Sequence, residues 1–387
     1  MRLYFISIIV SLSILTHVES FSSDRMSNFE SKQIVLDSSI SKFKVFYPVD
    51  YRNDTLFVVN PHKRRVKSNT IFSLQEYWDN SMKMYDLELP YSGIIDIVDL
   101  LVNDNYYILL DLQNLWIFNR SDLSFHKKIE LPNTLSEMRF AQNDNSIIEM
   151  SFCSISSFNK HKNTQTYAYK YNLRNDEGLY FAVDNPDNIE FTYVKRQLQS
   201  LCGNKFAVSN PLDYTIKIYT LNNTDTIIVK RLKEQWDNPK YSEITIDRNS
   251  PKKDIPNLML VRDSLFMIET VDFIGSDTLI VQWSKPHFEE SIPIYRKNYI
   301  DIWKINDKNA ELISENIPDE EVYGEDGLYL PEIGRFRYKN GYLYSVKKIP
   351  FLTNKLPNGT DIRKMIDDYQ IRNNFSDRYS VYLYKLK

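Results

Sequence analysis

The sequence predicts an all-β fold, a six-bladed β-propeller whose first and last strands pair with each other. Among its 387 residues Tyr (27) and Phe (21) are abundant while Gly (9) is scarce, and aromatic side chains favour strands. Residues 333–348 read as two alternating runs joined by Asn340-Gly341, the strongest short signal for a hairpin. Variants of this hairpin recur five more times, each followed by a third alternating run. A small antiparallel sheet is therefore repeated six times. Seven blades are the alternative, which requires one of the weaker runs to form a blade of its own.

Each of the first three units is expected to contain four strands, with a short turn between the first two. The predicted strands are Lys42–Tyr47, Thr55–Val59, Thr70–Leu74 and Met82–Leu89 in unit one, Ile94–Val102, Tyr106–Asp111, Leu115–Asn119 and Leu123–Leu131 in unit two, and Met138–Ala141, Ile147–Phe152, Gln165–Asn172 and Leu179–Val183 in unit three. The turns are placed at Asn53-Asp54, Asn103–Asn105 and Asn143–Asn145, because Asn and Asp tolerate the backbone angles of tight turns.

The last three units follow the same pattern with two long insertions. The predicted strands are Glu190–Leu198, Phe206–Ser209, Thr215–Leu221 and Thr226–Leu232 in unit four, Asn257–Val261, Leu265–Thr270, Tyr299–Ile305 and Ala310–Ile317 in unit five, and Arg335–Tyr338, Tyr342–Lys347 and Tyr379–Leu386 in unit six. The alternating run Thr278–Trp283 is assigned to the insertion in unit five.

Unit six ends one strand short, whereas Gln33–Asp37 near the start of the chain has no hairpin partner of its own. We therefore expect Gln33–Asp37 to complete the sheet that contains Tyr379–Leu386. Such a closure leaves only short sheet edges, which protects a propeller from edge-to-edge aggregation.

The N-terminus predicts export. Arg2 is followed by the apolar run Leu3–Leu15 and by Val18-Glu19-Ser20, a pattern typical of a cleaved signal peptide. A retained membrane anchor is the alternative, although the run is short for a membrane span. The predicted organisation is a signal peptide (1–20), a flexible segment (21–32) and one propeller domain (33–387). The mature protein is expected in the periplasm, on the cell surface or in the medium.

Export would place the two cysteines in an oxidising compartment. Cys153 and Cys202 fall in neighbouring units, so a disulfide between them and a pair of buried free thiols both fit the sequence.

The chain resembles the exported six-bladed β-propeller families of Gram-negative bacteria, many of which have no known function. The resemblance rests on the N-terminal QIVLD strand, on the strand start Asp54–Val58 and on the Glu-Leu-Pro blade ends at 88–90 and 130–132. The loop Pro90–Gly93 departs from the Gly-Pro-rich loop of similar proteins. The resemblance implies the fold and does not imply a reaction.

Two predicted insertions are adjacent in the ring and are expected to cap one sector of the channel face. They are Val271–Asn298, which contains His287, and Pro350–Asp377, which contains a helix-like stretch at 362–373. Long loops on a rigid scaffold often carry function, although they can equally be tolerated additions. His287 and Tyr91, the latter in the loop that enters unit two, are therefore candidate ligand-binding residues.

Three arginines are candidate ligand-binding residues on the innermost strands. Arg139, Arg335 and Arg337 could each place a guanidinium in the channel for an anionic ligand. The alternative is that they pair with carboxylates of neighbouring blades, such as Asp96 or Glu190, and hold the ring together.

The motifs and charge of the chain narrow the functional classes. A net charge of −3 gives no basic footprint for nucleic acid. The sequence has no HExxH, CxxC, GxSxG or Gly-rich phosphate loop, so we predict no metal site and no cofactor. The first hypothesis is an exported, non-enzymatic binding or scaffold propeller for a carbohydrate, a peptide or a partner protein. The alternative is a hydrolase or lyase that acts on polysaccharide or an ester at the channel mouth.

Overall fold

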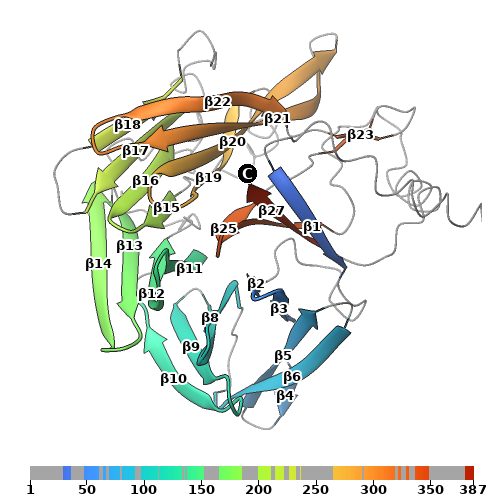
Figure 1. Ribbon diagram of the computed structural model, residues 1–387, viewed down its shortest axis with the longest axis vertical. Helices are drawn as coiled ribbons and strands as arrows, with labels where there is room; N and C mark the ends of the chain where they lie inside the picture. The colour runs from blue at the N-terminus through green and yellow to red at the C-terminus, as the bar shows by residue number, and fades with distance from the viewer. Residues whose placement is uncertain are drawn as a thin grey trace, which may run out of the picture.

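The computed structural model shows six antiparallel sheets, five of four strands and one of five, arranged around a centre (Figure 1). It describes residues 29–35, 48–60, 64–66, 69–78, 81–91, 97–111, 113–132, 135, 137–151, 165–184, 199–210, 214–221, 226–231, 236, 265–289, 292–318, 321–323, 328–330, 336–347 and 380–387. The prediction of a six-bladed propeller is confirmed.

The first three blades follow one another along the chain. Blade one contains β2 (Val49–Arg52), β3 (Thr55–Val59), β5 (Asn69–Trp78) and β6 (Ser81–Leu89), with the short β4 (Arg64–Val66) also paired to β5. Blade two contains β7 (Asp99–Val102), β8 (Tyr106–Leu110), β9 (Asn114–Asn119) and β10 (Phe125–Glu130). Blade three contains β11 (Glu137–Ala141), β12 (Asp144–Ser151), β13 (Gln165–Asn172) and β14 (Glu177–Asp184).

The last three blades complete the ring. Blade four contains β15 (Gln199–Cys202), β16 (Lys205–Asn210), β17 (Thr215–Thr220) and β18 (Thr226–Lys230). Blade five contains β19 (Met267–Phe273), β20 (Thr278–Glu289), β21 (Ile292–Ile305) and β22 (Ala310–Pro318). Blade six contains β25 (Arg337–Lys339), β26 (Tyr342–Lys347), β27 (Ser380–Leu386) and β1 (Phe29–Val35), and a separate pair is formed by β23 (Glu321–Tyr323) and β24 (Leu328–Leu330).

The two ends of the chain meet in blade six, as the sequence predicts. The strand β1 pairs antiparallel with β27 over its whole length, from Phe29 opposite Leu386 to Val35 opposite Ser380 (Figure 1). The strand begins four residues earlier than predicted, inside the segment that we expected to be flexible. Its first residue, Phe29, is buried between blades five and six with Ile280 and Ile300, which anchors the polar residues that follow it in the strand.

The prediction for blade five was wrong in its strand order. The run Thr278–Trp283 is the start of β20, the regular second strand, which pairs with both β19 and β21. The turn before it contains Gly275, whose φ of 72° supplies the left-handed conformation, so no Asn-Gly signal marks this hairpin. His287 consequently lies on β20, with its backbone opposite Tyr295, instead of in a long loop.

Several other predicted features lie outside the described residues or begin elsewhere. The innermost strand of blade one is β2, which follows Pro48, whereas the predicted strand Lys42–Tyr47 lies outside the described residues. The predicted strand Asn257–Val261 and the insertion Pro350–Asp377 also lie outside them, so the cap over the channel face stays a prediction.

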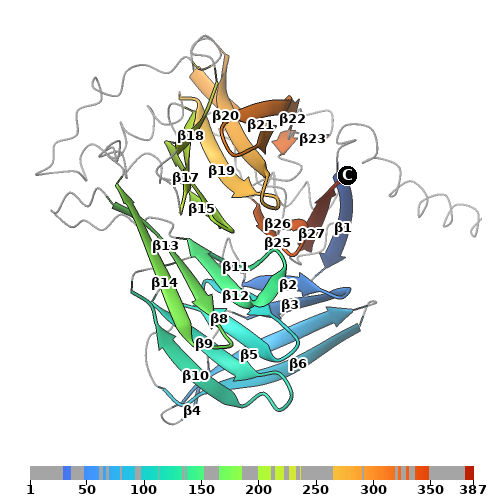
Figure 2. The same ribbon diagram turned by 60° about the vertical axis from the view of Figure 1, so that its left-hand side comes forward.

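The apolar core lies between neighbouring blades. Between blades one and two, for example, Phe57, Leu74 and Leu87 pack with Leu100 and Trp116, and all of these side chains are buried. Figure 2 shows the blades side by side, so that each sheet covers one face of the next. In the part of the chain that the structure describes, no helix is long and apolar enough to cross a membrane.

We expect Ile34→Asp to destabilise the protein strongly, because Ile34 on β1 packs against the cluster that joins blades six and one. A carboxylate in this cluster should lower the free energy of unfolding by about 3 kcal/mol. Glu30→Ala on the same strand, where the side chain is exposed, is the control and should change it by less than about 0.5 kcal/mol. Urea unfolding measures both, and equal effects would contradict the closure.

Candidate functional site

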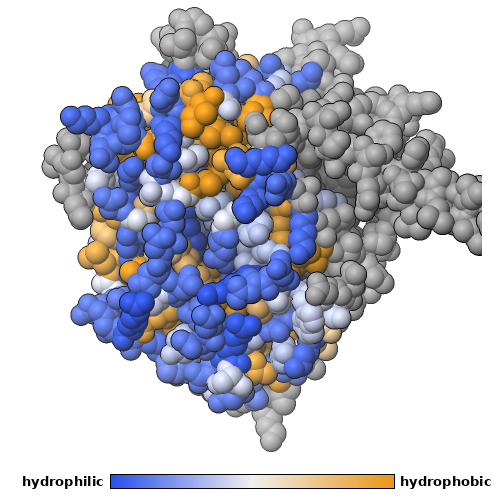
Figure 3. Space-filling view, in the orientation of Figure 1, coloured by the Kyte–Doolittle hydropathy of each residue, from blue (hydrophilic) through white to orange (hydrophobic). Residues whose placement is uncertain are grey.

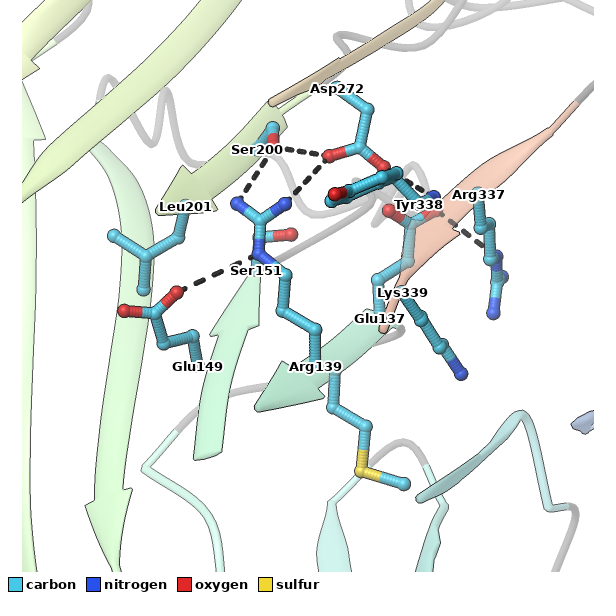
Figure 4. A pocket seen from close by; sticks show the side chains of 11 residues that line it. Glu137, Arg139, Glu149, Ser151, Ser200, Leu201, Asp272, Arg337, Tyr338 and Lys339 are labelled. Atoms are coloured by element: carbon cyan, nitrogen blue, oxygen red, sulfur yellow. Dashed lines mark hydrogen bonds and ion pairs between the residues drawn. The ribbon is translucent and has the colours of Figure 1, made fainter. Parts of the chain in front are cut away.

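A polar pocket lies where the innermost strands of blades three to six meet (Figure 4). Its lining comes from β11, β12, β15, β19 and β25. The pocket offers about 20 Å³ to water-sized molecules, which is space for one or two of them. Glu137 and Arg337, at the starts of β11 and β25, have side chains that are 31% and 22% exposed, so the pocket opens on the side where these strands begin.

Arg139 on β11 is the central side chain of this pocket. Its guanidinium Nη1 donates to Asp272 Oδ1 at 3.0 Å and to the carbonyl oxygen of Phe273 at 3.1 Å, and Nη2 donates to Ser200 Oγ at 3.2 Å. One side chain of blade three thereby holds the innermost strands of blades four and five. Burial lowers the pKa of Arg139, but the charges of Asp272 and Glu149 outweigh it, so that the pKa lies above its usual value and the group stays charged.

Glu149 on β12 is the carboxylate nearest to the other side of Arg139. Its side chain is 1% exposed, Oε1 accepts the backbone N–H of Gly203 at 2.8 Å, and Lys170 Nζ lies 3.4 Å away. Its second oxygen, Oε2, lies 3.6 Å from Arg139 Nε and has no hydrogen-bond partner among the residues that the structure describes. Glu149 is therefore ion-paired but only half satisfied by hydrogen bonds.

Three aspartates on innermost strands repeat one contact between blades. Asp50, Asp99 and Asp272 each accept the N–H of the following residue with Oδ1, at 3.0, 2.9 and 2.9 Å. With Oδ2 they accept an N–H from the next blade, that of Val102, Met138 and Tyr338 at 2.7, 2.9 and 2.8 Å, respectively. Each aspartate therefore joins two blades at the axis through backbone N–H groups.

Two cations of β25 cross the centre to reach the opposite blades. The buried Lys339 donates to Asp99 Oδ1 and, at 3.0 Å, to the carbonyl oxygen of Leu100. Arg337 lies 3.5 Å from Asp99 Oδ1 and 3.5 Å from Glu137 Oε1. Blade six is thus tied to blades two and three by ion pairs.

Asp50 titrates at an unusual pH because it is fully buried. Burial raises its pKa to about 7, while the charge of Lys339 and the N–H groups of Val102 and Tyr51 act in the opposite direction. Oδ1 also accepts Asn340 Nδ2 at 2.8 Å, so Asp50 contacts blades six, one and two.

The structure brings two of the predicted site residues together. Arg139 and Arg337 both line the pocket, and both pair with carboxylates, although these are not the expected Asp96 and Glu190, which lie outside the described residues. Whether either arginine also binds a ligand stays a prediction. Arg335 lies outside the described residues as well.

Tyr91 and His287 do not line this pocket. Tyr91 lies beside the third and fourth strands of blade two, where its ring contacts those of Trp116 and Phe125 at centroid distances of 5.4 and 5.8 Å. His287 is on the distal part of the β20–β21 hairpin, two residues before the strand ends. The two residues therefore lie on different blades.

Sequence reasoning missed the three bridging aspartates, although a signal for them exists. Each follows a valine and precedes a large apolar residue, as in Val49-Asp50-Tyr51, Val98-Asp99-Leu100 and Val271-Asp272-Phe273. A charge at a buried position of a predicted innermost strand could have been noted as a repeated feature.

The cysteines and metal ligands add little to the site. Cys202 on β15 is a buried free thiol whose pKa is raised by burial, and Cys153 lies outside the described residues. Over the described ranges, no three His, Cys, Asp or Glu side chains are grouped so that they could hold a metal ion.

Comparison with known proteins identifies likenesses in structure only. No family model matches the chain, and no curated protein matches it. A Bacteroides fragilis protein, named only as a proposed exported protein, is 14% identical over 95% of this chain and 97% of its own, with a TM-score of 0.49. The Neurospora crassa Pan2 WD40 domain is 9% identical over 88% of each chain, with a TM-score of 0.40.

The N-terminal domain of Nup159 is 10% identical over 84% of this chain and 78% of its own, with a TM-score of 0.42. All three likenesses are distant, so the six-bladed architecture rests on the strand pairing described above.

We expect Asp50→Asn to change how stability depends on pH. Because the folded pKa of about 7 is raised from 3.8, the stabilising contribution of Asp50 is complete below about pH 4 and is lost as the pH rises to about 7. Relative to the variant, the wild type should lose up to about 1.4 kcal/mol of stability per pH unit in this window.

Urea unfolding at several pH values measures this difference. The amide introduced by Asp50→Asn would turn a donor toward Val102 N–H at every pH, so the variant is expected to be less stable than the wild type at every pH. Only the pH dependence of the difference in unfolding free energy therefore tests the prediction. A difference that does not vary with pH would show that Asp50 is ionised throughout.

We expect Arg139→Met to lower the free energy of unfolding by about 3 kcal/mol, because it leaves Asp272 and Glu149 charged and buried with fewer partners. Arg174→Ala is the control: its side chain is 72% exposed and lies 3.0 Å from Asp144, a surface pair that contributes less than about 1 kcal/mol. Chemical denaturation of both variants tests this, and similar losses would argue against a structural role for the buried pair.

Proposed function

We propose that the protein is an exported, non-enzymatic binding propeller that recognises a carbohydrate, a peptide or a partner protein at the pocket of Arg139 and Arg337. The observation that carries this proposal is the pocket itself: polar side chains from four blades converge at the centre of a rigid ring. Pockets with a few fixed polar groups on a rigid scaffold are the usual form of a ligand site.

The position of the longest connections supports binding on the same face. Residues 152–164 and 348–379 join the second strand of a blade to the third, and residues 185–198 and 231–266 join one blade to the next. In a four-stranded blade both kinds of connection leave the sheet on the side where the innermost strand begins. Glu137 and Arg337 open the pocket toward that side. The other strand connections are mostly short turns, such as Asn53-Asp54 and Asn340-Gly341.

The chemistry of the pocket supports binding over catalysis. Asp272 accepts the N–H groups of Phe273 and Tyr338 together with the Arg139 guanidinium, and Glu149 is paired with Arg139 and Lys170. Carboxylates held in this way are stabilised as fixed acceptors instead of as proton-transfer groups. The polar surface around the ring centre also fits a hydrophilic ligand (Figure 3).

Export is proposed from the sequence. The apolar run Leu3–Leu15 and the small residues Val18 and Ser20 support cleavage of a signal peptide. The mature protein would then be located in the periplasm, on the cell surface or in the medium.

A binding screen of the chain without residues 1–20 against glycans, peptides and envelope components tests the function. For a ligand found in this way, Arg337→Ala is expected to weaken binding at least about tenfold, because the removed guanidinium lies at the pocket mouth.

Arg52→Ala is the matched control for this variant. Arg52 is on blade one, its side chain is 17% exposed, and it pairs with Asp104 of blade two at 3.3 Å. Neither residue lines the pocket, so ligand binding should stay unchanged. Full binding by Arg337→Ala would contradict the proposed site, and turnover of a bound polysaccharide or ester would favour the hydrolase instead.

A further inference from the structure

The pocket contains one strong acceptor that its surroundings leave unused. Glu149 is one of the residues that line the cavity, its side chain is 1% exposed, and its buried Oε2 lacks a hydrogen-bond partner among the described residues. A buried carboxylate oxygen without a donor costs free energy, so a group that donates to it there is stabilised. This oxygen defines where a ligand donor would bind.

The guanidinium of Arg139 faces Oε2 without donating a hydrogen bond to it. Arg139 directs Nη1 and Nη2 to Asp272, Phe273 and Ser200, and its Nε stays 3.6 Å from Oε2, beyond an ordinary hydrogen bond. Figure 4 shows Glu149 and the guanidinium facing each other across this separation. A small group placed beside both atoms could accept from Nε–H and donate to Oε2.

The balance of charge argues against an ionic group at this position. Three cations and three carboxylates line the pocket, namely Arg139, Arg337, Lys339, Glu137, Glu149 and Asp272. An anion beside both atoms would be attracted by Arg139 but repelled by Glu149, and a cation would meet the reverse, so either charge carries a repulsive cost. A neutral hydroxyl has no such cost, and it donates and accepts at the same time.

The size of the cavity leads to the same group. A space of about 20 Å³ for water-sized groups admits a hydroxyl, and the rest of the ligand would extend toward the open side, where Arg337 and Glu137 lie.

We propose that the pocket binds a neutral carbohydrate, with one hydroxyl of the sugar between Glu149 Oε2 and Arg139 Nε. This inference rests on the proposed function and narrows its ligand class. It also revises the expectation of an anionic ligand for Arg139, because the cationic groups of the pocket are already balanced by carboxylates.

The test is an array of neutral oligosaccharides beside an array of uronate- and sulfate-bearing oligosaccharides, probed with the chain without residues 1–20. We expect binding of a neutral oligosaccharide that Arg337→Ala weakens. Deoxy analogues of its terminal sugar should then show one position at which loss of the hydroxyl weakens binding about 10- to 100-fold, because Glu149 would be left without its donor.

Glu149→Gln links this effect to its residue. It replaces one acceptor oxygen by an NH₂ group at nearly constant volume, so the parent sugar should bind the variant at least about tenfold more weakly than the wild type. The deoxy analogue should bind the variant and the wild type with nearly equal affinity. Glu177→Gln, on an exposed residue of β14, is the matched control and should bind like the wild type. If Glu149→Gln does not fold, the binding of the deoxy analogues to the wild-type protein tests the inference by itself.

The outcomes separate this inference from the proposed function. Binding of only acidic oligosaccharides or peptides, weakened by Arg337→Ala, would overturn the neutral-sugar inference and leave the proposed function in place. A neutral sugar whose hydroxyls all contribute equally would also overturn the inference. Binding of no ligand, or binding that Arg337→Ala does not affect, would overturn both.

Discussion

The pairing of β1 with β27 is the constraint on which the rest of the molecule depends. A propeller is a ring of sheets that pack face to face, and an open ring would expose the apolar faces of its first and last blades. Here the last blade takes one strand from the start of the chain, so backbone hydrogen bonds close the ring. The buried Phe29 at the start of that strand adds an apolar anchor between blades five and six.

A closed ring creates a second problem at its centre, where the innermost strands converge with few apolar side chains between them. Polar contacts hold these strands together. Asp50, Asp99 and Asp272 each accept a backbone N–H of another blade. Arg139 and Lys339 form ion pairs with carboxylates across the axis. These groups are buried, so each depends on its partners to remain charged. The polar centre thereby fixes the blades relative to one another.

The same network determines what the pocket can recognise. Because its cations and carboxylates already compensate one another, the pocket does not offer a free positive charge to an anion. What it offers is one buried oxygen without a donor among the described residues, Glu149 Oε2, in a cavity of about 20 Å³. Recognition at such a place depends on hydrogen-bond geometry more than on charge.

The sequence by itself determined the architecture, because alternation of apolar and polar residues and turn residues such as Asn340-Gly341 are local signals. It also determined the closure, since a strand without a partner at one end matched a missing strand at the other. It failed in blade five, where the Gly275 turn carries no Asn-Gly signal and β20 was taken for an insertion. The partners of Arg139 were decided only by the tertiary structure, because Glu149, Ser200 and Asp272 come from three blades and up to 133 residues along the chain. Such contacts depend on how the sheets pack around the axis, and no local pattern of the chain encodes that distance.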